Sequence, residues 1–323
     1  MMTMDSSEDI QITGETSTRT IGVVVADYLY AGDLVDGVLA GPLQRFPEAE
    51  TGRDSEDSSF IEFHTDALVD AICQLILRVA GDSPDDVDAV GLTLPGLIRH
   101  GVVEEAPNLP QLKGARLGEL LCQKLAAHGM HAPVVVSNDA DATAAGLAAT
   151  HGSLDRRIRV WTLGTGIGFG SYPQSEGTWE GGHTVVTLDE RENYCGCGGR
   201  GHLEGIMGHR AMRLRFLDME PEEVFAAACR KDHPDQRCCE FRNLWHRALA
   251  AATASSIHIG GAGKFFFTGY NVHFLDLNLL REYLHDMVKM SPLQSYQLEI
   301  VDDHQKFRVI GAAITADQVT ARC

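Results

Sequence analysis

The chain has 323 residues, of which 44% are hydrophobic, and it carries a formal net charge of −18. This length accommodates two domains of ordinary size. The strong negative charge argues against nucleic acid and anionic membranes as partners, because both are themselves negatively charged. No run of about 18 apolar residues is present, so we expect no membrane span.

Residues 1–20 are polar and acidic and lack the apolar stretch of a secretory signal, so we expect a disordered leader there. The chain also contains eight cysteines. Without a signal peptide, these cysteines point to a reducing compartment, the cytoplasm, in which thiols are free or metal-bound.

The first half of the chain alternates between predicted strands and helices. A β-branched run predicts a first strand over 20–25, and a second candidate runs over 37–39 and on to Leu43. Apolar residues spaced three to four apart predict a helix over 59–81. The other elements predicted here are strands over 88–94 and 133–137 and helices over 117–128 and 139–150.

The second half continues this alternation. A strand over 157–163 runs into a glycine-rich stretch over 164–170. The elements predicted after it are strands over 184–188, 264–268 and 297–301 and helices over 221–230, 240–256, 275–290 and 307–320. Alternating strands and helices are typical of α/β proteins, and a boundary near 140–151 divides the chain into two α/β halves.

A cluster of two histidines and two cysteines is the most informative feature of the chain. His183 is followed, after a gap, by Cys195-Gly-Cys197 and then His202. A Cys-x-Cys pair alone is often just two thiols, but these four residues together can close a tetrahedral zinc site. Glycines at 196, 198, 199 and 201 let the backbone fold tightly around an ion. Because protein ligands fill all four positions, we expect a structural zinc rather than a catalytic one.

Two glutamates flank this cluster. Glu180 precedes its first ligand and Glu204 follows its last. A bound metal would fix the loop that carries them, and a rigid pair of carboxylates suits the recognition of a polyol.

Asn138 and Asp139 lie where a predicted strand gives way to a helix. Ligands of open α/β sheets bind beyond the carboxyl ends of strands. A carboxylate at this position can serve as a plain helix cap, or it can accept a proton from a hydroxyl that attacks phosphorus. Both interpretations stay open at this point.

The glycine-rich stretch after the strand over 157–163 also allows two interpretations. Its glycines and hydroxyl allow backbone N–H groups to face a phosphate. Many such stretches are simply hairpin turns, so the pattern alone is weak evidence.

These motifs, taken in order, resemble the ROK family of sugar kinases, repressors and related open reading frames, over roughly residues 21–316. The motifs are Pro95-Gly96, Pro107-Asn108-Leu109-Pro110, Asn138-Asp139-Ala-Asp-Ala, Leu163-Gly-Thr-Gly-Ile-Gly, Glu180-x-Gly-His183 and Cys195-x-Cys-Gly-x-x-Gly. The resemblance implies a two-domain, actin-like (ribonuclease H-like) ATPase fold with a sugar in the cleft between the domains. The expected domains are 21–140 with a returning helix over 307–323, and 141–306 with the zinc loop.

The resemblance also implies functions for single residues. Asp139 matches the catalytic base. The residues that match sugar contacts are Asn108, Asn138, Glu180, His183 and Glu204. The residues that match a phosphate loop are Gly164, Thr165, Gly166 and Gly168. The family usually has a third cysteine where this chain has His202, and imidazole is an acceptable replacement as a zinc ligand.

Two departures from the family pattern concern the nucleotide. Family kinases follow the first strand with Asp-x-Gly-Gly-Thr, whereas here Asp27 is followed by Tyr28, which is bulky where a phosphate needs close backbone approach. Family kinases place three glycines after a later strand to admit adenosine, whereas here the stretch is Thr268-Gly-Tyr-Asn271. The nucleotide side is therefore altered, while every matched sugar-side residue is kept.

Three functions agree with this asymmetry. The favoured one is a kinase for a hexose, amino sugar or cyclitol that uses Mg-ATP. The second is an enzyme that kept the sugar pocket for isomerisation, elimination or hydrolysis. The third is a ligand sensor, although we expect no DNA-binding repressor because about twenty residues before the first strand are too few for a winged helix. Family members are commonly dimers or tetramers, so a homo-oligomer is expected.

Overall fold

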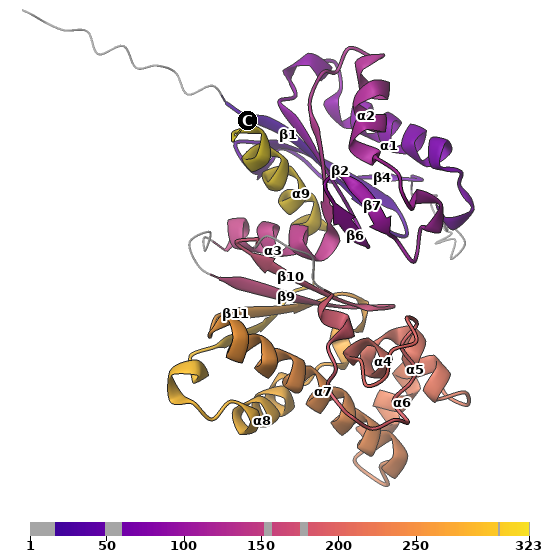
Figure 1. The fold of residues 1–323 in the computed structure, drawn as a ribbon, viewed down its shortest axis with the longest axis vertical. Helices are drawn as coiled ribbons and strands as arrows, with labels where there is room; N and C mark the ends of the chain where they lie inside the picture. The colour runs from indigo at the N-terminus through magenta and orange to yellow at the C-terminus, as the bar shows by residue number, and fades with distance from the viewer. Residues whose placement is uncertain (1–16, 49–59, 152–156, 175–179, 303, 323) are drawn as a thin grey trace, which may run out of the picture.

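The computed structural model describes residues 17–48, 60–151, 157–174, 180–302 and 304–322. It shows two α/β bodies, one above the other, with helices α3 (Asp139–Thr150) and α9 (His304–Thr320) between their sheets (Figure 1). Most of the expected leader over 1–20 lies outside the described residues, and the first strand already begins at Arg19. Within the described ranges, no helix is long and apolar enough to cross a membrane.

The first sheet is mixed, and its central strand is almost wholly buried. Its strands are β1 (Arg19–Val25), β2 (Leu29–Val35), β3 (Val38–Leu39), β4 (Gln44–Phe46), β5 (Ala89–Leu94) and β8 (Val134–Asn138). Their order is β3-β2-β1-β5-β8, with β4 also paired to β2. β1, β5 and β8 are parallel, which explains why they contain near-continuous apolar runs. A hairpin of β6 (Leu97–Arg99) and β7 (Val102–Glu105) follows β5.

The second sheet has the order β10-β9-β11-β12. Its strands are β9 (Ile158–Leu163), β10 (Ile167–Tyr172), β11 (Lys264–Thr268) and β12 (Gln297–Ile300). β9, β11 and β12 run parallel, and β10 returns antiparallel along β9. Trp161, Phe265 and Phe267 of this sheet form a core with Trp245 of a covering helix.

The remaining helices cover the outer faces of the two sheets. They are α1 (Thr65–Ala80), α2 (Leu117–Ala126), α4 (Leu203–Met207), α5 (His209–Arg215), α6 (Pro221–Ala228), α7 (Gln236–Gly260) and α8 (Leu277–Met287). The helix predicted over 139–150 and the strand over 264–268 match their observed bounds. α7 begins earlier than predicted because the Asp235 side chain caps it by accepting a hydrogen bond from the Cys238 N–H.

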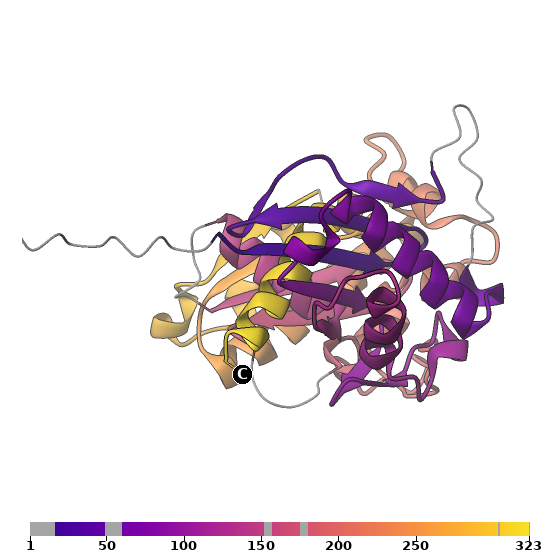
Figure 2. The same ribbon diagram turned by 90° about the horizontal axis from the view of Figure 1, so that it is seen from above.

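Helices α3 and α9 cross at very close range. A Cβ at Gly311 of α9 would lie 1.7 Å from the Ala142 carbonyl oxygen of α3, and one at Gly22 of β1 would lie 1.9 Å from the Val309 carbonyl oxygen of α9. The view from above shows α9 running alongside the strands of the first sheet (Figure 2). The last helix therefore returns to the N-terminal sheet, and its position there is determined by backbone contact.

The structure contradicts one predicted strand and contains strands that were not predicted, namely β2, β4, β6, β7 and β10. The strand predicted over 184–188 is wrong: one isolated bridge joins Val185 to His202, and Leu188 is 92% exposed. This segment forms backbone hydrogen bonds with residues 201–203, at the end of the loop that carries Cys195 and Cys197, rather than with a sheet. β2 was not predicted, because Gly32 and Asp33 interrupt its apolar pattern; pairing with β1 along its whole length overrides their weak strand propensity.

Candidate functional site

The site begins at the carboxyl edge of the first sheet. Val24 of β1 pairs with Thr93 of β5, which in turn pairs with Ser137 of β8. Because these strands are parallel and in register, the turn after β1 and the start of α3 open onto the same edge. This is the place where open α/β sheets bind ligands.

Asn138, rather than Asp139, is the N-cap of α3. The Asn138 side-chain oxygen accepts hydrogen bonds from the Ala140 N–H at 2.8 Å and the Asp141 N–H at 3.3 Å. Its amide nitrogen donates to the Gly96 carbonyl at 2.8 Å. The interpretation of Asp139 as a plain helix cap is therefore wrong, and its carboxylate is available for another purpose.

The Asp139 carboxylate forms a buried ion pair with an arginine from the end of the chain. Arg308 Nη2 of α9 lies 3.1 Å from Asp139 Oδ2, and the two side chains are 11% and 12% exposed. The Asp139 carbonyl oxygen accepts a hydrogen bond from the Thr143 hydroxyl, which holds the first turn of α3 in place. The carboxylate is therefore shielded from solvent and neutralised by one guanidinium.

Two further carboxylates lie near Asp139. Burial of its carboxyl group raises the pKa of Glu180, although the residue as a whole is exposed; His183 opposes the rise, and the charges of Glu204 and Asp139 add to it. Glu204 Oε2 accepts a hydrogen bond from the Ile167 N–H at 3.1 Å. The folded chain thus gathers three acids that are far apart in the sequence.

A hollow of about 200 Å³ opens beside this junction. Of the residues expected to contact a sugar, Asn138 and Glu180 line it, together with Asp141. Asp141 links α3 to β10, since its carboxylate accepts hydrogen bonds from the Ser171 N–H and the Gln174 side chain. Asn108 lies in an exposed turn after β7 and does not line this hollow.

The structure brings His183, Cys195, Cys197 and His202 together. One ligand atom from each lies within 4.8 Å of all the others. The Nδ1 atoms of the two histidines are 3.3 Å apart, the two sulfurs are 3.4 Å apart, and the sulfur–Nδ1 distances are 3.4 Å for Cys195–His183 and 3.3 Å for Cys197–His202. Ligands of a tetrahedral zinc are separated by about 3.3 to 3.8 Å, so the residues fit this ion.

The chemistry of the donor set also fits a cation. Burial raises the pKa of the Cys195 thiol to about 12, and the neighbouring Cys197 and Glu204 groups contribute to the rise. A bound Zn²⁺ would reverse this effect because it stabilises the thiolate directly. Cys195 Sγ also lies 3.6 Å from Glu204 Oε1, so the cluster is directly linked to one of the three carboxylates.

The glycine-rich stretch forms the hairpin turn between β9 and β10. Leu163 pairs with Ile167, which leaves Gly164, Thr165 and Gly166 as the turn and places Gly168 in β10. The Gly164 carbonyl accepts hydrogen bonds from the His209 N–H at 3.0 Å and the Asn271 side chain at 2.9 Å. The turn is thus held by two side chains: Asn271 donates a hydrogen bond to Gly164, and Glu204 accepts one from the Ile167 N–H.

The two altered nucleotide motifs carry ring contacts. At the turn after β1, the Arg45 guanidinium carbon lies 4.0 Å from the centre of the Tyr28 ring. After β11, the Tyr270 hydroxyl donates to Glu222 Oε1 at 3.0 Å, and the ring is 62% exposed. Aromatic and cationic side chains thus lie where the family pattern has glycines.

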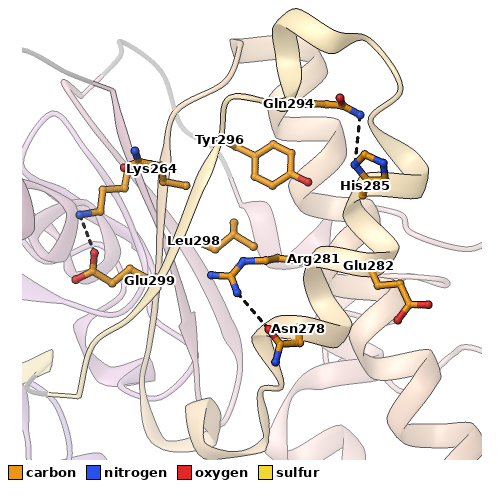
Figure 3. A pocket seen from close by; sticks show the side chains of 10 residues that line it. Lys264, Asn278, Arg281, Glu282, His285, Gln294, Tyr296, Leu298 and Glu299 are labelled. Carbon is orange, nitrogen blue, oxygen red and sulfur yellow. Dashed lines mark hydrogen bonds and ion pairs between the residues drawn. The ribbon is translucent and has the colours of Figure 1, made fainter.

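A larger hollow of about 820 Å³ lies elsewhere, between α8 and β12 (Figure 3). Lys264 Nζ is 2.7 Å from Glu299 Oε2, and Arg281 donates to the Asn278 side-chain oxygen at 3.3 Å (Figure 3). None of the expected site residues lines this hollow. We therefore place the site at the first hollow despite its smaller volume.

Three residues of the site were not found from the sequence: Arg45, Asn271 and Arg308. Asn271 carried a weak signal, because it lies in the stretch that departs from the family pattern. Arg308 carried none, since its partner comes from a distant part of the chain. Arg45 carried none either, because its contact with Tyr28 depends on the pairing of β2 with β4, which the sequence did not predict.

Comparison with known proteins identifies the family of the chain. A family model described as "ROK family" matches residues 56–319 of the chain. Glucokinase from Pyrobaculum calidifontis is 31% identical over 185 residues, which cover 53% of this chain and 58% of that protein. The matched stretch is therefore less than two thirds of that relative. N-acetylmannosamine kinase from Haemophilus influenzae is 26% identical over 269 residues, covering 78% of this chain and 85% of that protein.

A solved structure has the same architecture. The ROK hexokinase from Thermus thermophilus superposes with a TM-score of 0.75 at 21% sequence identity, over 95% of this chain and 100% of that one. At this level of identity, the likeness is one of fold.

Proposed function

Because this chain belongs to the ROK family and has its mixed α/β, actin-like ATPase fold, we propose that it is a sugar kinase. The substrate class is a hexose, an amino sugar or a cyclitol, and the donor is Mg-ATP. The observation that carries the proposal is the gathering of Asp139, Glu180 and Glu204 at the carboxyl edge of the first sheet. The names of the two sequence relatives, glucokinase and N-acetylmannosamine kinase, support it.

In the proposed reaction, Asp139 is the general base. Its carboxylate accepts the proton of the sugar hydroxyl as the hydroxyl oxygen attacks the terminal phosphorus of the donor. Its position at the first turn of α3 is fixed by the cap at Asn138 and by the ion pair to Arg308. Closure of the two domains, 21–140 with 307–323 and 141–306, would exclude water and limit hydrolysis of the donor.

The loop with the metal-binding cluster positions the sugar-side carboxylates. His183, Cys195, Cys197 and His202 would hold a zinc, which supplies a rigid structural knot with no open coordination position. Glu180 and Glu204 would then accept hydrogen bonds from sugar hydroxyls, and His183 would donate one to a sugar oxygen through the N–H of its remaining ring nitrogen. Asn108 and Asn138 are proposed as further sugar contacts.

The phosphate donor is proposed to approach the hairpin turn between β9 and β10. Gly164, Thr165, Gly166 and Gly168 form this turn and its continuation into β10. Its backbone N–H groups suit phosphate oxygens. A homo-oligomer, dimer or tetramer, is part of the proposal, as is the absence of a nucleic-acid partner.

A second function is favoured by the contacts on the nucleotide side. Tyr28 and Arg45 fill the turn after β1, and Glu204 already accepts the Ile167 N–H at the expected phosphate loop. These contacts support an enzyme that keeps the sugar pocket and performs isomerisation, elimination or hydrolysis without ATP.

Mass spectrometry separates the two functions. A panel of hexoses, amino sugars and cyclitols is incubated with the protein, with and without Mg-ATP. Addition of one phosphate to a sugar only with ATP is the expected result. A change in one compound that needs no ATP would replace the kinase with the second function.

A further inference from the structure

Arg308 is the cation closest to the proposed base. Among the described residues, it alone forms an ion pair with Asp139, Glu180 or Glu204. Its Nη2 holds Asp139 Oδ2, and its buried Nε has no hydrogen-bond partner within the described residues. The guanidinium therefore has donor capacity beyond its contact with the carboxylate.

The backbone that carries Arg308 has little room to move. The neighbouring Val309 carbonyl lies so close to β1 that a Cβ on Gly22 would be 1.9 Å away. Any movement of the guanidinium must therefore come from the side chain. Helix α9 lies between the two bodies of the molecule (Figure 1). The Arg308 side chain extends from it to Asp139 at the start of α3.

The charge around Asp139 raises a problem for a phosphate donor. Glu180 and Glu204 lie near Asp139, and the whole chain carries a formal charge of −18. A phosphoryl group that approaches three carboxylates is repelled unless a cation accompanies it. The magnesium of the proposed donor supplies part of this compensation, and Arg308, which contacts Asp139, is the protein's own cation at this position.

We propose that Arg308 is a catalytic residue that passes from Asp139 to the transferred phosphoryl group during the reaction. This role rests on the proposed kinase function. The sugar O–H bond breaks and its proton goes to Asp139, while the sugar oxygen forms a bond to phosphorus. The bond from phosphorus to the bridging oxygen of the donor breaks, and its electron pair leaves with the nucleotide.

Proton transfer changes the balance of charge around the guanidinium. A protonated Asp139 no longer neutralises Arg308, so the guanidinium becomes available as negative charge spreads over the phosphoryl oxygens. Its planar fork of N–H groups matches phosphate geometry. The interaction strengthens as the transition state forms, which is the condition for a contact to raise kcat.

Arg308→Met tests this role, with Arg308→Lys as a second variant. We expect Arg308→Met to lower kcat by roughly 100-fold or more, the usual effect of removing a group that stabilises developing charge. Affinity for the sugar alone, measured by calorimetry, should stay close to that of the wild type. Arg308→Lys should recover part of kcat, because an ammonium keeps the charge but lacks the planar fork.

Arg19→Met is the matched control. Arg19 also forms a partly buried ion pair, with Asp33 at 2.9 Å and side chains 19% and 23% exposed. It lies at the amino end of β1, whereas the site lies at the carboxyl edge of the sheet. We expect this variant to lose some stability and to keep its kcat. Melting temperatures of all variants separate lost folding from lost catalysis.

Three outcomes overturn the inference. The first is a kcat of Arg308→Met within a few-fold of the wild type. The second is a loss of kcat in Arg308→Met no larger than that in Arg19→Met. Either result would make the ion pair purely structural. If Arg308→Met fails to fold, a folded Arg308→Lys with the full wild-type kcat also overturns it. A wild-type protein that phosphorylates no sugar removes the proposed function itself, and the wild type alone reveals this.

Discussion

Asp139 shows how one residue acquires a function from its surroundings. Its place after a strand indicated either a helix cap or a base, and the sequence did not decide between them. In the structure, Asn138 supplies the cap and Arg308 reaches Asp139 from α9. The carboxylate proposed as the base is therefore buried, is not needed as the cap and is held by an arginine from a distant part of the chain.

Replacement of this carboxylate gives the residue-scale prediction. We expect Asp139→Asn to lower kcat by roughly 100-fold or more, because positioned base catalysis contributes at least this factor. Steady-state kinetics with the sugar found in the panel is the measurement. Asp235→Asn is the control, since Asp235 is an exposed cap of α7 far from the site in sequence. Turnover of Asp139→Asn within a few-fold of the wild type would show that the base is assigned wrongly.

At the scale of elements, the crossing of α3 and α9 joins the two sheets. α3 is rich in alanine because both α9 and β10 pack against it, so large side chains have no space. The sequence predicted both helices, over 139–150 and 307–320, from segments rich in alanine and other small residues. It did not predict their crossing, because the contact depends on small residues in two segments more than 150 residues apart, one near the middle of the chain and one near its end.

Gly311 tests this crossing. We expect Gly311→Ala to destabilise the protein by about 1–3 kcal/mol or more, because the added Cβ would meet the Ala142 carbonyl oxygen at 1.7 Å. Chemical denaturation measures the change. Gly41→Ala is the control, since a Cβ there meets nothing within 4 Å. Equal stability of both variants would mean that the helices are not in close contact.

His246 gives a prediction about pH. This residue of α7 is 0% exposed; its Nδ1 donates to the Arg242 carbonyl, and its Nε2 accepts from the Asp276 N–H. Burial lowers the pKa of His246 to about 4. Between pH 6.5 and 4, His246 is therefore protonated in the unfolded chain but neutral in the folded protein. Its contribution to the free energy of unfolding is complete above about pH 6.5 and is lost as the pH falls toward 4.

The loss from this one histidine amounts to about 3 kcal/mol at most. Denaturant unfolding at a series of pH values measures it. His246→Gln should flatten the slope between pH 6.5 and 4, whereas His258→Gln, on the exposed side of the same helix, should keep it. An unchanged slope in His246→Gln would show that the ring is already protonated in the folded protein.

At the scale of the whole molecule, the metal-binding cluster connects several segments of the second body that border the site. Its ligands come from a 3-10 turn at Gly181–His183 and from the loop before α4, and Glu204 at the start of α4 contacts both Cys195 and the β9–β10 hairpin. A metal here would hold these segments in one arrangement. Without it, the sugar-side carboxylates would lose their common support.

Metal analysis tests this arrangement. We expect about one zinc per chain in protein purified without chelator, and near none in Cys197→Ser, because a structural site needs all four ligands. The melting temperature should fall together with the metal content. Cys229→Ser is the control, since Cys229 is exposed and outside the cluster. Wild-type protein without bound zinc would exclude the four-ligand site.

The sequence by itself determined the α/β alternation, the closely spaced part of the metal-binding cluster and the place of Asp139 after a strand. These features depend on periodicity and short spacing, which are local properties of the chain. Tertiary structure alone decided that α3 and α9 cross in backbone contact and that Arg308 reaches Asp139. Such contacts join segments far apart in the chain, and packing determines them, so no local pattern could predict them.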